Sequence, residues 1–195
     1  EDYKAFLAGE EKNAAHIFGA HERTVNGVKG VLFNVWAPKA LSVSVVGEFN
    51  KYDGRVHLME RIEDTGVFEL FIPGLAAGCG YMYETKRQGK GTTRKLDPVS
   101  RQISSVPITA SVVSDENMSD SYAWNDGLWM IKRKKEAGKK KPVTVYEVSL
   151  TDWLKEKSAD ELVDFVKQEG YTHVCFLPVA EYLNEEMNGY STLGY

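Results

Sequence analysis

Between residues 30 and 113, apolar and polar residues alternate along short segments that are rich in β-branched and aromatic side chains. Four of these segments read GVLFNVWAP, LSVSVVGEF, GVFELFIPG and GYMYETKRQG, beginning at Gly30, Leu41, Gly66 and Gly80. Turn-forming sequences such as NKYDG and QGKG separate them. Short strands at intervals of about ten residues are typical of an antiparallel sandwich. We therefore expect a β-sandwich over this part of the chain.

The hydrophobic pattern changes after Pro142. VTVYEVSL is a continuous apolar strand pattern, and THVCFLPV, from Thr172, is a second one. Between them, SADELVDFVKQEG has apolar residues at helical spacing, Ser158 at the N-cap with Glu161 three residues later, and Gly170 at its end. A strand, a helix and a strand at this spacing predict a βαβ unit whose two parallel strands are buried.

A βαβ unit cannot bury both faces of its strands by itself. A (β/α)₈ barrel needs roughly 250 residues, whereas only about fifty follow Pro142. We therefore expect residues 142–195 to be the start of an incomplete barrel, and the chain to be a piece of a longer protein. The predicted fold class is mostly β, a sandwich followed by the first βαβ unit of a truncated barrel.

Two further segments complete the predicted domain organisation. Residues 1–29 are mixed and polar, and we expect a lead-in segment with a short helix there. Residues 114–141 are polar and end in the basic run KRKKEAGKKK, which is typical of a linker. The run could attract phosphates, but it is short and no aromatic residue lies among its charges, so a solvated linker is the better interpretation.

Composition and charge limit the classes of partner that we expect for this chain. The chain has 195 residues, of which 43% are hydrophobic and 27% charged, and its formal net charge is −4. This charge gives no general attraction to nucleic acid or to anionic membranes. No apolar run approaches the roughly 20 residues that span a bilayer, and the first residues lack the features of a signal peptide. We expect neither nucleic acid nor membrane as a partner.

The two cysteines indicate the compartment. Cys79 and Cys175 are far apart in the sequence, and each lies within an apolar pattern. Free, buried thiols in a reducing compartment are the favoured interpretation, with a disulfide as the alternative. We therefore expect a cytoplasmic protein.

Motifs for metal, phosphate or triad chemistry are not found in the sequence. The four histidines, at positions 16, 21, 57 and 173, show no metal-ligand spacing. No glycine-rich phosphate loop follows a strand, and no Ser-His-Asp arrangement can be located. We expect neither a metal nor another cofactor.

Seven segments in a fixed order carry a resemblance to a known family. They are GAH at 19–21, FNVWAPKA at 33–40, VSVVGEFNKYDGRVHLM at 43–59, GVFELFIPG at 66–74, KLDPVS at 95–100, VYEVSLTDW at 145–153 and GYTHVCFLPVAE at 170–181. Together they resemble the 1,4-α-glucan (glycogen) branching enzymes of the α-amylase superfamily, over nearly the whole chain.

The resemblance implies an immunoglobulin-like carbohydrate-binding module followed by a catalytic (β/α)₈ barrel. It also implies an activity, the transfer of α-1,4-linked glucan segments to a 6-hydroxyl, which makes the α-1,6 branches of glycogen. The chemistry is that of a retaining glycosidase, with a carboxylate nucleophile and an acid. In the family these carboxylates follow later barrel strands, so we expect this chain alone to be inactive, and α-glucan to be its partner.

The resemblance implies two candidate glucan-binding residues. Tyr52, in FNKYDG, stands where the family usually has Trp, and an aromatic ring at this place stacks on a sugar in related modules. Tyr190, in NGYSTLGY, matches a loop Tyr that lies beneath the sugar at the cleavage point. Met82 stands where related modules commonly have Lys, and it cannot donate a hydrogen bond to a sugar hydroxyl. We therefore expect weak or no glycan binding by the sandwich.

Other family positions are expected to be structural. Strand alternation predicts that Phe68 packs in the core, and Trp36 before a proline is typical of core or interface packing. We expect Glu147 and Glu181 not to be catalytic. The structural signature residues are Trp36, Pro38, Phe49, Asn50, Asp97 and Pro98.

Two other functions remain open. The chain could be a stand-alone glucan-binding module that has lost its barrel. It could also come from another α-amylase-superfamily enzyme with a similar front module, such as an isoamylase-type debranching enzyme. The residues that follow Tyr195 would distinguish these hypotheses from a branching enzyme.

Overall fold

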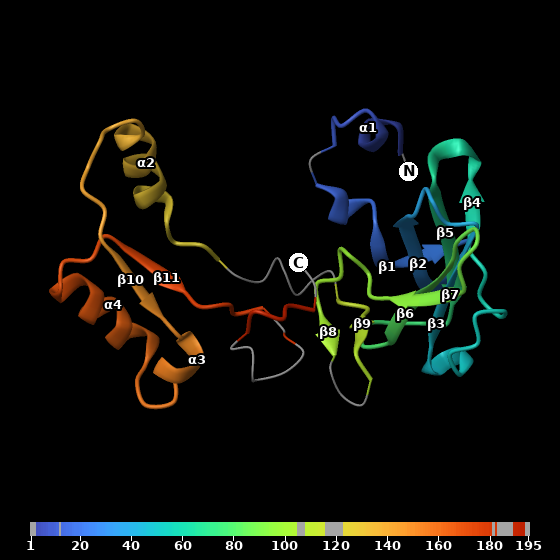
Figure 1. The fold of residues 1–195 in the computed structure, drawn as a ribbon. Helices are drawn as coiled ribbons and strands as arrows, with labels where there is room; N and C mark the ends of the chain where they lie inside the picture. The colour runs from blue at the N-terminus through green and yellow to red at the C-terminus, as the bar shows by residue number, and fades with distance from the viewer. Residues whose placement is uncertain are drawn as a thin grey trace. The chain divides into compact units, whose positions relative to one another are not determined.

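The computed structural model in Figure 1 describes residues 3–11, 13–104, 108–115, 123–180, 182 and 189–193. Contacts within the chain divide it into two compact units, one within residues 1–120 and one within residues 121–193. Each unit has its own hydrophobic core.

The first unit is built from two antiparallel sheets (Figure 1). One has the order β1-β2-β5-β4, with β1 (Gly19–Val25), β2 (Val28–Trp36), β4 (Glu60–Ile62) and β5 (Val67–Pro73). The other has the order β3-β6-β9-β8, with β3 (Ser42–Gly47), β6 (Gly80–Lys86), β8 (Ile103–Ser104) and β9 (Ala110–Val112), while β7 (Thr92–Lys95) also pairs with β6. The predicted immunoglobulin-like β-sandwich is confirmed in this two-sheet form.

The sandwich core contains side chains from both sheets. The residues buried in it include Val31, Phe33, Val43, Val45, Phe68, Tyr81 and Tyr83. They recur at every second position of their strands, as a half-buried sheet requires. The rings of Phe33 and Tyr81 pack edge to face with centroids 5.0 Å apart. Burial of each large apolar side chain contributes about 1.5–3 kcal/mol. The predicted core position of Phe68 is confirmed.

The first sheet begins before residue 30, so the boundary predicted for the lead-in segment differs from the structure. Strand β1 pairs with β2 through a turn at Asn26 and Gly27, whose φ angles are +50° and +81°. Asn-Gly is the residue pair that this hairpin turn favours, so the sequence carried a signal for the strand. The helix α1 (Tyr3–Leu7) and the 3₁₀ turn η1 (Ala14–His16) precede it. The predicted short helix is therefore present, but it occupies only the start of the segment.

The second unit contains the predicted βαβ arrangement. Its elements are α2 (Gly127–Glu136), β10 (Val145–Val148), α3 (Leu150–Trp153), α4 (Ala159–Gln168) and β11 (His173–Phe176). Strands β10 and β11 are parallel neighbours. The predicted capping box begins α4, since Ser158 Oγ accepts a hydrogen bond from Glu161 N–H and Glu161 Oε2 accepts one from Ser158 N–H, at 3.2 and 2.7 Å. Helix α2 lies within the segment predicted to be a linker, residues 114–141, and none of its residues is buried.

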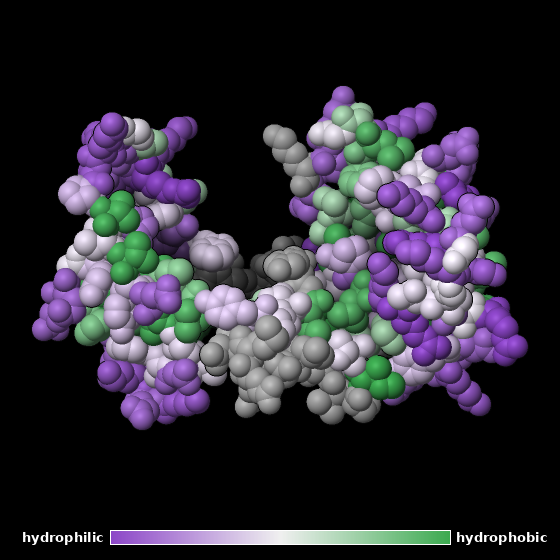
Figure 2. Space-filling view, in the orientation of Figure 1, coloured by the Kyte–Doolittle hydropathy of each residue, from purple (hydrophilic) through white to green (hydrophobic). Residues whose placement is uncertain are grey.

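The small sheet of the second unit is covered on one side. Val148, Leu162 and Val166 form its buried core, with partly buried residues of α3 and α4 around them. All four residues of β11 are exposed, so the prediction of a buried second strand is wrong for the described chain. Figure 2 shows green, apolar residues at the surface of this unit. Val174 and Phe176 share the side of Val148 but remain exposed. Val145 and Cys175 lie on the opposite side and are also exposed, so no described residue covers that side.

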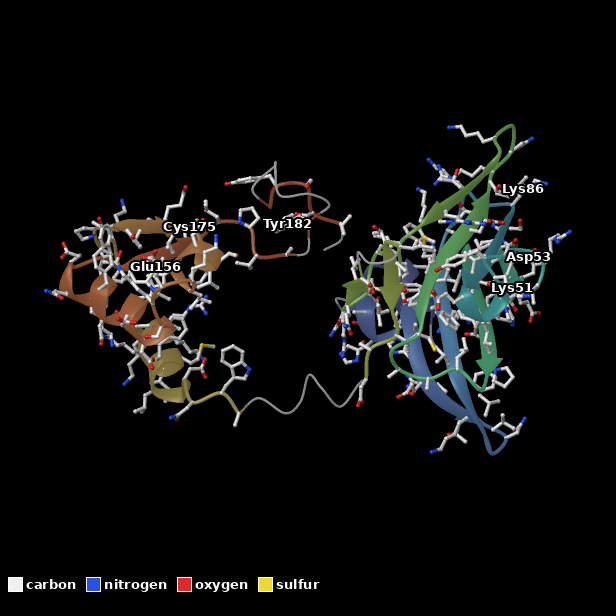
Figure 3. All side chains as sticks on the ribbon, turned by 90° about the horizontal axis from the view of Figure 1, so that it is seen from below. Lys51, Asp53, Lys86, Glu156, Cys175 and Tyr182 are labelled. Carbon is white, nitrogen blue, oxygen red and sulfur yellow. The ribbon has the colours of Figure 1, made fainter. Side chains whose placement is uncertain are left out.

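Both cysteines are free thiols. Cys79 is half-buried, whereas Cys175 lies on β11 and is exposed (Figure 3), so the expected burial of Cys175 is wrong. The cause is the uncovered side of the small sheet. Among the helices that the structure describes, none is long and apolar enough to cross a membrane.

Candidate functional site

The loop that carries Tyr52 follows β3 and is held in place by Asn50. Asn50 is buried at the end of the 3₁₀ turn η2 (Glu48–Asn50). Its Oδ1 accepts a hydrogen bond from Gly47 N–H at 3.0 Å, and its Nδ2 donates to the Val45 carbonyl at 2.8 Å. The same nitrogen lies 2.9 Å from Nδ1 of His57, whose pKa is lowered by burial. Asn50 therefore ties the loop to the strand before it.

The loop makes a left-handed turn at its tip. Lys51 and Tyr52 have φ angles of +54° and +57°, a conformation that L-residues adopt only where surrounding contacts hold it. The Phe49 ring lies against the His57 ring, with centroids 5.5 Å apart. Figure 3 shows the tip from another side, with Lys51 and Asp53 on it. Phe49 and Asn50, two of the signature residues, are thus part of the loop that presents Tyr52.

Arg94 on β7 packs against one face of the Tyr52 ring. Its guanidinium carbon lies 5.7 Å from the ring centroid, and its Nη2 donates to the Tyr52 carbonyl at 2.8 Å. Its Nε donates to Glu84 Oε2 on β6 at 3.0 Å. A Cβ at Gly54 would collide with the Glu84 carboxylate, so a larger residue there would displace this carboxylate from its contact with Arg94. The ring is therefore held by a cation–π contact and by two sheet strands.

A pocket lies beside Tyr52, and in such pockets a small number of polar groups fixes the orientation of a ligand. Its volume is about 330 Å³. Its lining residues are Glu48, Tyr52, Gly78, Gly80, Gln102, Ser104, Ile108, Ala110 and Val112. We call it the Tyr52 pocket. An aromatic ring with carboxylate, amide and hydroxyl groups around it suits the apolar face and the hydroxyls of a glucose ring. Met82 is not among the lining residues.

A second hollow, which we call the Trp36 groove, lies at the other end of β6. Its volume is about 340 Å³. Its lining residues are Val35, Trp36, Ala37, Pro38, Lys39, Ala40, Tyr83, Thr85, Arg87, Lys95, Leu96 and Pro98. Three of the signature residues, Trp36, Pro38 and Pro98, meet in it. The Tyr52 pocket contacts Gly80 at the start of β6, and the groove contacts residues at the end of that strand.

Trp36 is not a core residue. It is the last residue of β2 and is 47% exposed. Its Nε1 donates to the Thr65 carbonyl at 3.3 Å, and its ring meets the Phe6 ring edge to face with centroids 5.4 Å apart. Val35, its neighbour in the sequence, points into the core, so alternation turns Trp36 outward. The alternation can be recognised in the sequence. It does not predict that about half of the Trp36 side chain remains exposed to solvent.

Asp97 holds the chain segment that brings Pro98 to the groove. The side chain is 2% exposed, and its Oδ2 accepts hydrogen bonds from the hydroxyls of Tyr81 and Tyr83 at 2.6 and 3.3 Å. Its Oδ1 accepts from Val99 N–H at 2.9 Å, and its own N–H donates to Ser111 Oγ at 2.9 Å. Burial raises the pKa of this carboxyl, and the tyrosine hydrogen bonds oppose the rise. Asp97 is a structural group inside the sandwich.

Tyr190 lies in the second unit and is 65% exposed. A hollow of about 480 Å³ follows the carboxyl ends of β10 and β11 and is lined by Ser149, Leu150, Thr151, Asp152, Lys155, Leu177, Pro178 and Tyr182. Tyr190 is not among these residues; Tyr182 is labelled in Figure 3. Residues 183–188, with Asn188, and also Glu181 lie outside the described part of the chain. Glu147 on β10 is exposed.

Among the described residues, no group of three or more histidine, cysteine, aspartate or glutamate side chains could hold a metal ion. The two hollows of the sandwich each combine an aromatic ring with hydrogen-bonding groups, as small-molecule sites do.

Matches to known proteins cover the whole chain. Residues 17–100 match carbohydrate-binding module 48, described as the isoamylase N-terminal domain. The chain is 40% identical, over its whole length, to the 1,4-alpha-glucan branching enzyme GlgB of Methylococcus capsulatus, and 41% identical to that of Nitrosococcus oceani. It spans 27% of the length of each of these enzymes.

Solved structures show the same fold at lower identity. A putative alpha amylase from Salmonella typhimurium is 22% identical, with a TM-score of 0.54 over 90% of this chain and 27% of that one. The catalytic module of the glycogen-degrading pneumococcal virulence factor SpuA is 21% identical, with a TM-score of 0.53 over 85% of this chain and 27% of that one. The chain therefore shares its fold with the corresponding parts of these two proteins.

Proposed function

We propose that this chain, which is homologous along its whole length to about a quarter of the GlgB branching enzymes, forms the front part of a 1,4-α-glucan branching enzyme. The observation that carries the proposal is the continuity of the match. The match at 40% identity covers the whole chain and therefore includes both the sandwich and the β10-α4-β11 unit. The sandwich is the module that contacts α-glucan, and the βαβ unit opens the catalytic (β/α)₈ barrel.

The reaction of the whole protein is a retaining double displacement. A carboxylate attacks the sugar, an acid protonates the leaving oxygen, and a sugar 6-hydroxyl takes the place of water in the second step. Strand β11 carries no catalytic carboxylate in this proposal, and Glu147 remains a surface residue of β10. The nucleophile and the acid belong to barrel strands that come after this chain. The uncovered side of the small sheet supports a larger domain around it.

Contact with glucan at the Tyr52 pocket is weak in this account. Tyr52 offers one aromatic face, because Arg94 lies on the other. Outside the pocket, Met82 supplies no hydrogen bond to a bound chain, where related modules commonly have lysine. One stacked ring with a few exposed hydrogen bonds corresponds to a dissociation constant of about 1 mM, or about 4 kcal/mol. Tyr190 is a second candidate sugar contact, supported by its exposure after β11.

The compartment that we propose is the cytoplasm. Two free thiols, of which Cys175 is exposed, support a reducing environment.

A chimera tests the proposal. In it, residues 1–195 replace the matched part of the M. capsulatus branching enzyme, and iodine staining measures the branching of amylose. We expect the chimera to lower the long-wavelength absorbance of the iodine complex and the chain alone to leave it unchanged. A folded chimera without branching would contradict the proposal. A fall in absorbance with the chain alone would contradict the expected absence of catalysis.

A stand-alone glucan-binding module is the second candidate. The observation in its favour is that all described lining residues of the Tyr52 pocket and the Trp36 groove belong to the first unit. It predicts glucan binding by the chain, but no activity in the chimera, so the same experiment separates the two functions.

A further inference from the structure

The Trp36 groove has a charge that a neutral sugar does not explain. Lys39, Arg87 and Lys95 line it, and no carboxylate is among the described residues that do so. Within the described part of the chain, none of these three side chains forms an ion pair. The formal net charge of the whole chain is −4. The groove therefore carries a local positive charge, opposite in sign to the net charge of the chain.

The cations are placed by strands of the sandwich. Lys95 ends β7 opposite Tyr83 of β6, and Arg87 directly follows β6. Arg94 and Lys95 are neighbours on β7, so their side chains point to opposite faces of the sheet. Arg94 accordingly braces Tyr52, whereas Lys95 lines the groove. Lys39 lies on the turn between β2 and β3, which the Ala40 N–H closes on the Ala37 carbonyl at 2.9 Å.

The rest of the groove suits one sugar ring. The indole of Trp36 and the two prolines, Pro38 and Pro98, give it apolar walls. Thr85 contributes a hydroxyl, which donates to the Thr93 carbonyl at 3.2 Å and can still accept a hydrogen bond. A volume of about 340 Å³ lies at the small end of the range for small-molecule sites, which is about 300–1,000 Å³.

A phosphate group is the anion that this arrangement fits. Lysine and arginine bind phosphate oxygens through charge-assisted hydrogen bonds, which are roughly twice as strong as neutral ones. An aromatic face stacks on the apolar face of a sugar. A ligand that carries both groups uses the indole and the cations together, whereas a neutral glucan leaves the cations without a partner.

We propose that the Trp36 groove binds a phosphorylated sugar, with the sugar ring against Trp36 and the phosphate between Arg87 and Lys95. The chemistry is shared by two sources, a free hexose phosphate and a phosphate monoester on a glucan chain. The inference rests on the proposed role of the sandwich in sugar binding, but it concerns a surface other than the Tyr52 pocket.

Isothermal titration of the chain with four ligands tests the inference. The ligands are glucose 6-phosphate, a maltooligosaccharide carrying one phosphate monoester, the unphosphorylated maltooligosaccharide, and inorganic phosphate. We expect a phosphorylated sugar to bind at least tenfold more tightly than either the neutral sugar or phosphate alone. Comparison of the two phosphorylated ligands identifies the source. Added salt should weaken the binding, since the charges are exposed.

Variants place the ligand within the groove. Lys95→Gln and Arg87→Gln should each weaken binding about three- to tenfold, which is the effect of a partly exposed charge-assisted hydrogen bond. Lys86→Gln is the matched control, because Lys86 is the neighbour of Arg87 and does not line the groove (Figure 3). Trp36→Ala should abolish binding and Trp36→Phe should restore part of it, which separates the loss of a ring from a failure to fold.

Three results would overturn the inference. The first is equal affinity for the neutral and phosphorylated sugars. The second is an effect of Lys86→Gln on binding as large as that of Lys95→Gln. The third is no binding of any phosphorylated ligand at a ligand concentration of about 20 mM, which is well above the millimolar dissociation constant of a weak site. Binding of the neutral sugar that is lost in Tyr52→Ala, together with no phosphosugar binding, would refute only this inference and leave the proposed function intact.

Discussion

At the scale of single residues, Asn50 and Asp97 each hold a loop by bonding several groups at once. Asn50 satisfies the Gly47 N–H and the Val45 carbonyl, and Asp97 accepts from two tyrosines and a backbone N–H. Family resemblance predicted both as structural residues. The sequence alone could not give their partners, because these lie up to 16 positions away and meet only in the folded sandwich.

The Asn50→Ala substitution should lower the free energy of unfolding by about 2–4 kcal/mol. It leaves a backbone N–H and a carbonyl without partners, and each such loss costs about 1–3 kcal/mol. Urea unfolding measures the effect. Glu60→Ala, on an exposed edge position, is the control and should change stability by less than about 0.5 kcal/mol. Equal effects of the two substitutions would contradict the role of Asn50.

The Asp97 carboxyl should make stability depend on pH. Its pKa is raised by burial in the folded state, so the folded chain holds the proton more tightly than the unfolded chain. Ionisation then costs stability as pH rises from the ordinary pKa to the raised one. The stability of the wild type relative to Asp97→Asn should therefore fall as pH rises from about 4 into this window, and then stay level. Unfolding free energies measured in a pH series test this.

The control for the pH series is Asp53→Asn. Arg55 donates to Asp53 at 2.7 Å and lowers the pKa of that exposed carboxyl. A lowered pKa gives stability that is lost as pH falls, so the pH dependence should have the opposite sign and be small, because the pair is solvated. A wild-type stability that rises with pH relative to Asp97→Asn would show that the hydrogen bonds of Asp97 outweigh its burial.

At the scale of elements, strong local patterns predicted the structure well and weak ones did not. The strands beginning near Gly30, Leu41, Gly66 and Gly80 were readable from alternation, and α4 from its capping box. Strand β1 was missed because GAHERTV has few apolar residues, although Asn26 and Gly27 marked its turn. Helix α2 was read as linker, since its charges are typical of a solvated segment and none of its residues is buried.

The Ser158→Ala substitution should loosen α4. It removes the hydroxyl that accepts from Glu161 N–H, and the loss of such a cap costs about 1 kcal/mol. Hydrogen exchange of the amides in residues 159–168 should become about fivefold faster, as that energy implies. Glu156→Ala, just before the cap, should leave the rates unchanged. Equal rates in Ser158→Ala and wild type would contradict the capping role.

At the scale of the whole molecule, the two units differ in how completely they bury their strands. The sandwich encloses a core between two sheets, whereas β11 is exposed along its length. The sequence predicted this contrast through the length of the chain after Pro142. It could not predict that the groove at the end of β6 would gather Trp36 with three cations, because those residues come from three separate segments.

The two units should unfold separately. Few apolar contacts stabilise the small sheet, so its amides should exchange at lower opening free energy than those of β3 and β6. Hydrogen exchange followed by mass spectrometry should show complete exchange of residues 145–148 and 173–176 while residues 43–46 remain protected. Loss of protection in all three segments at one rate would contradict two independent units.

If the sandwich is the glucan-contacting front of a branching enzyme, as we propose, it should bind an α-glucan at the Tyr52 pocket. The most direct measurement is a titration of the isotope-labelled chain with maltoheptaose, followed by amide resonances. The account predicts fast-exchange shifts centred on Tyr52, Gln102 and Ile108, a dissociation constant of about 1 mM, and their loss in Tyr52→Ala. Shifts elsewhere that survive Tyr52→Ala, or tight micromolar binding, would contradict it.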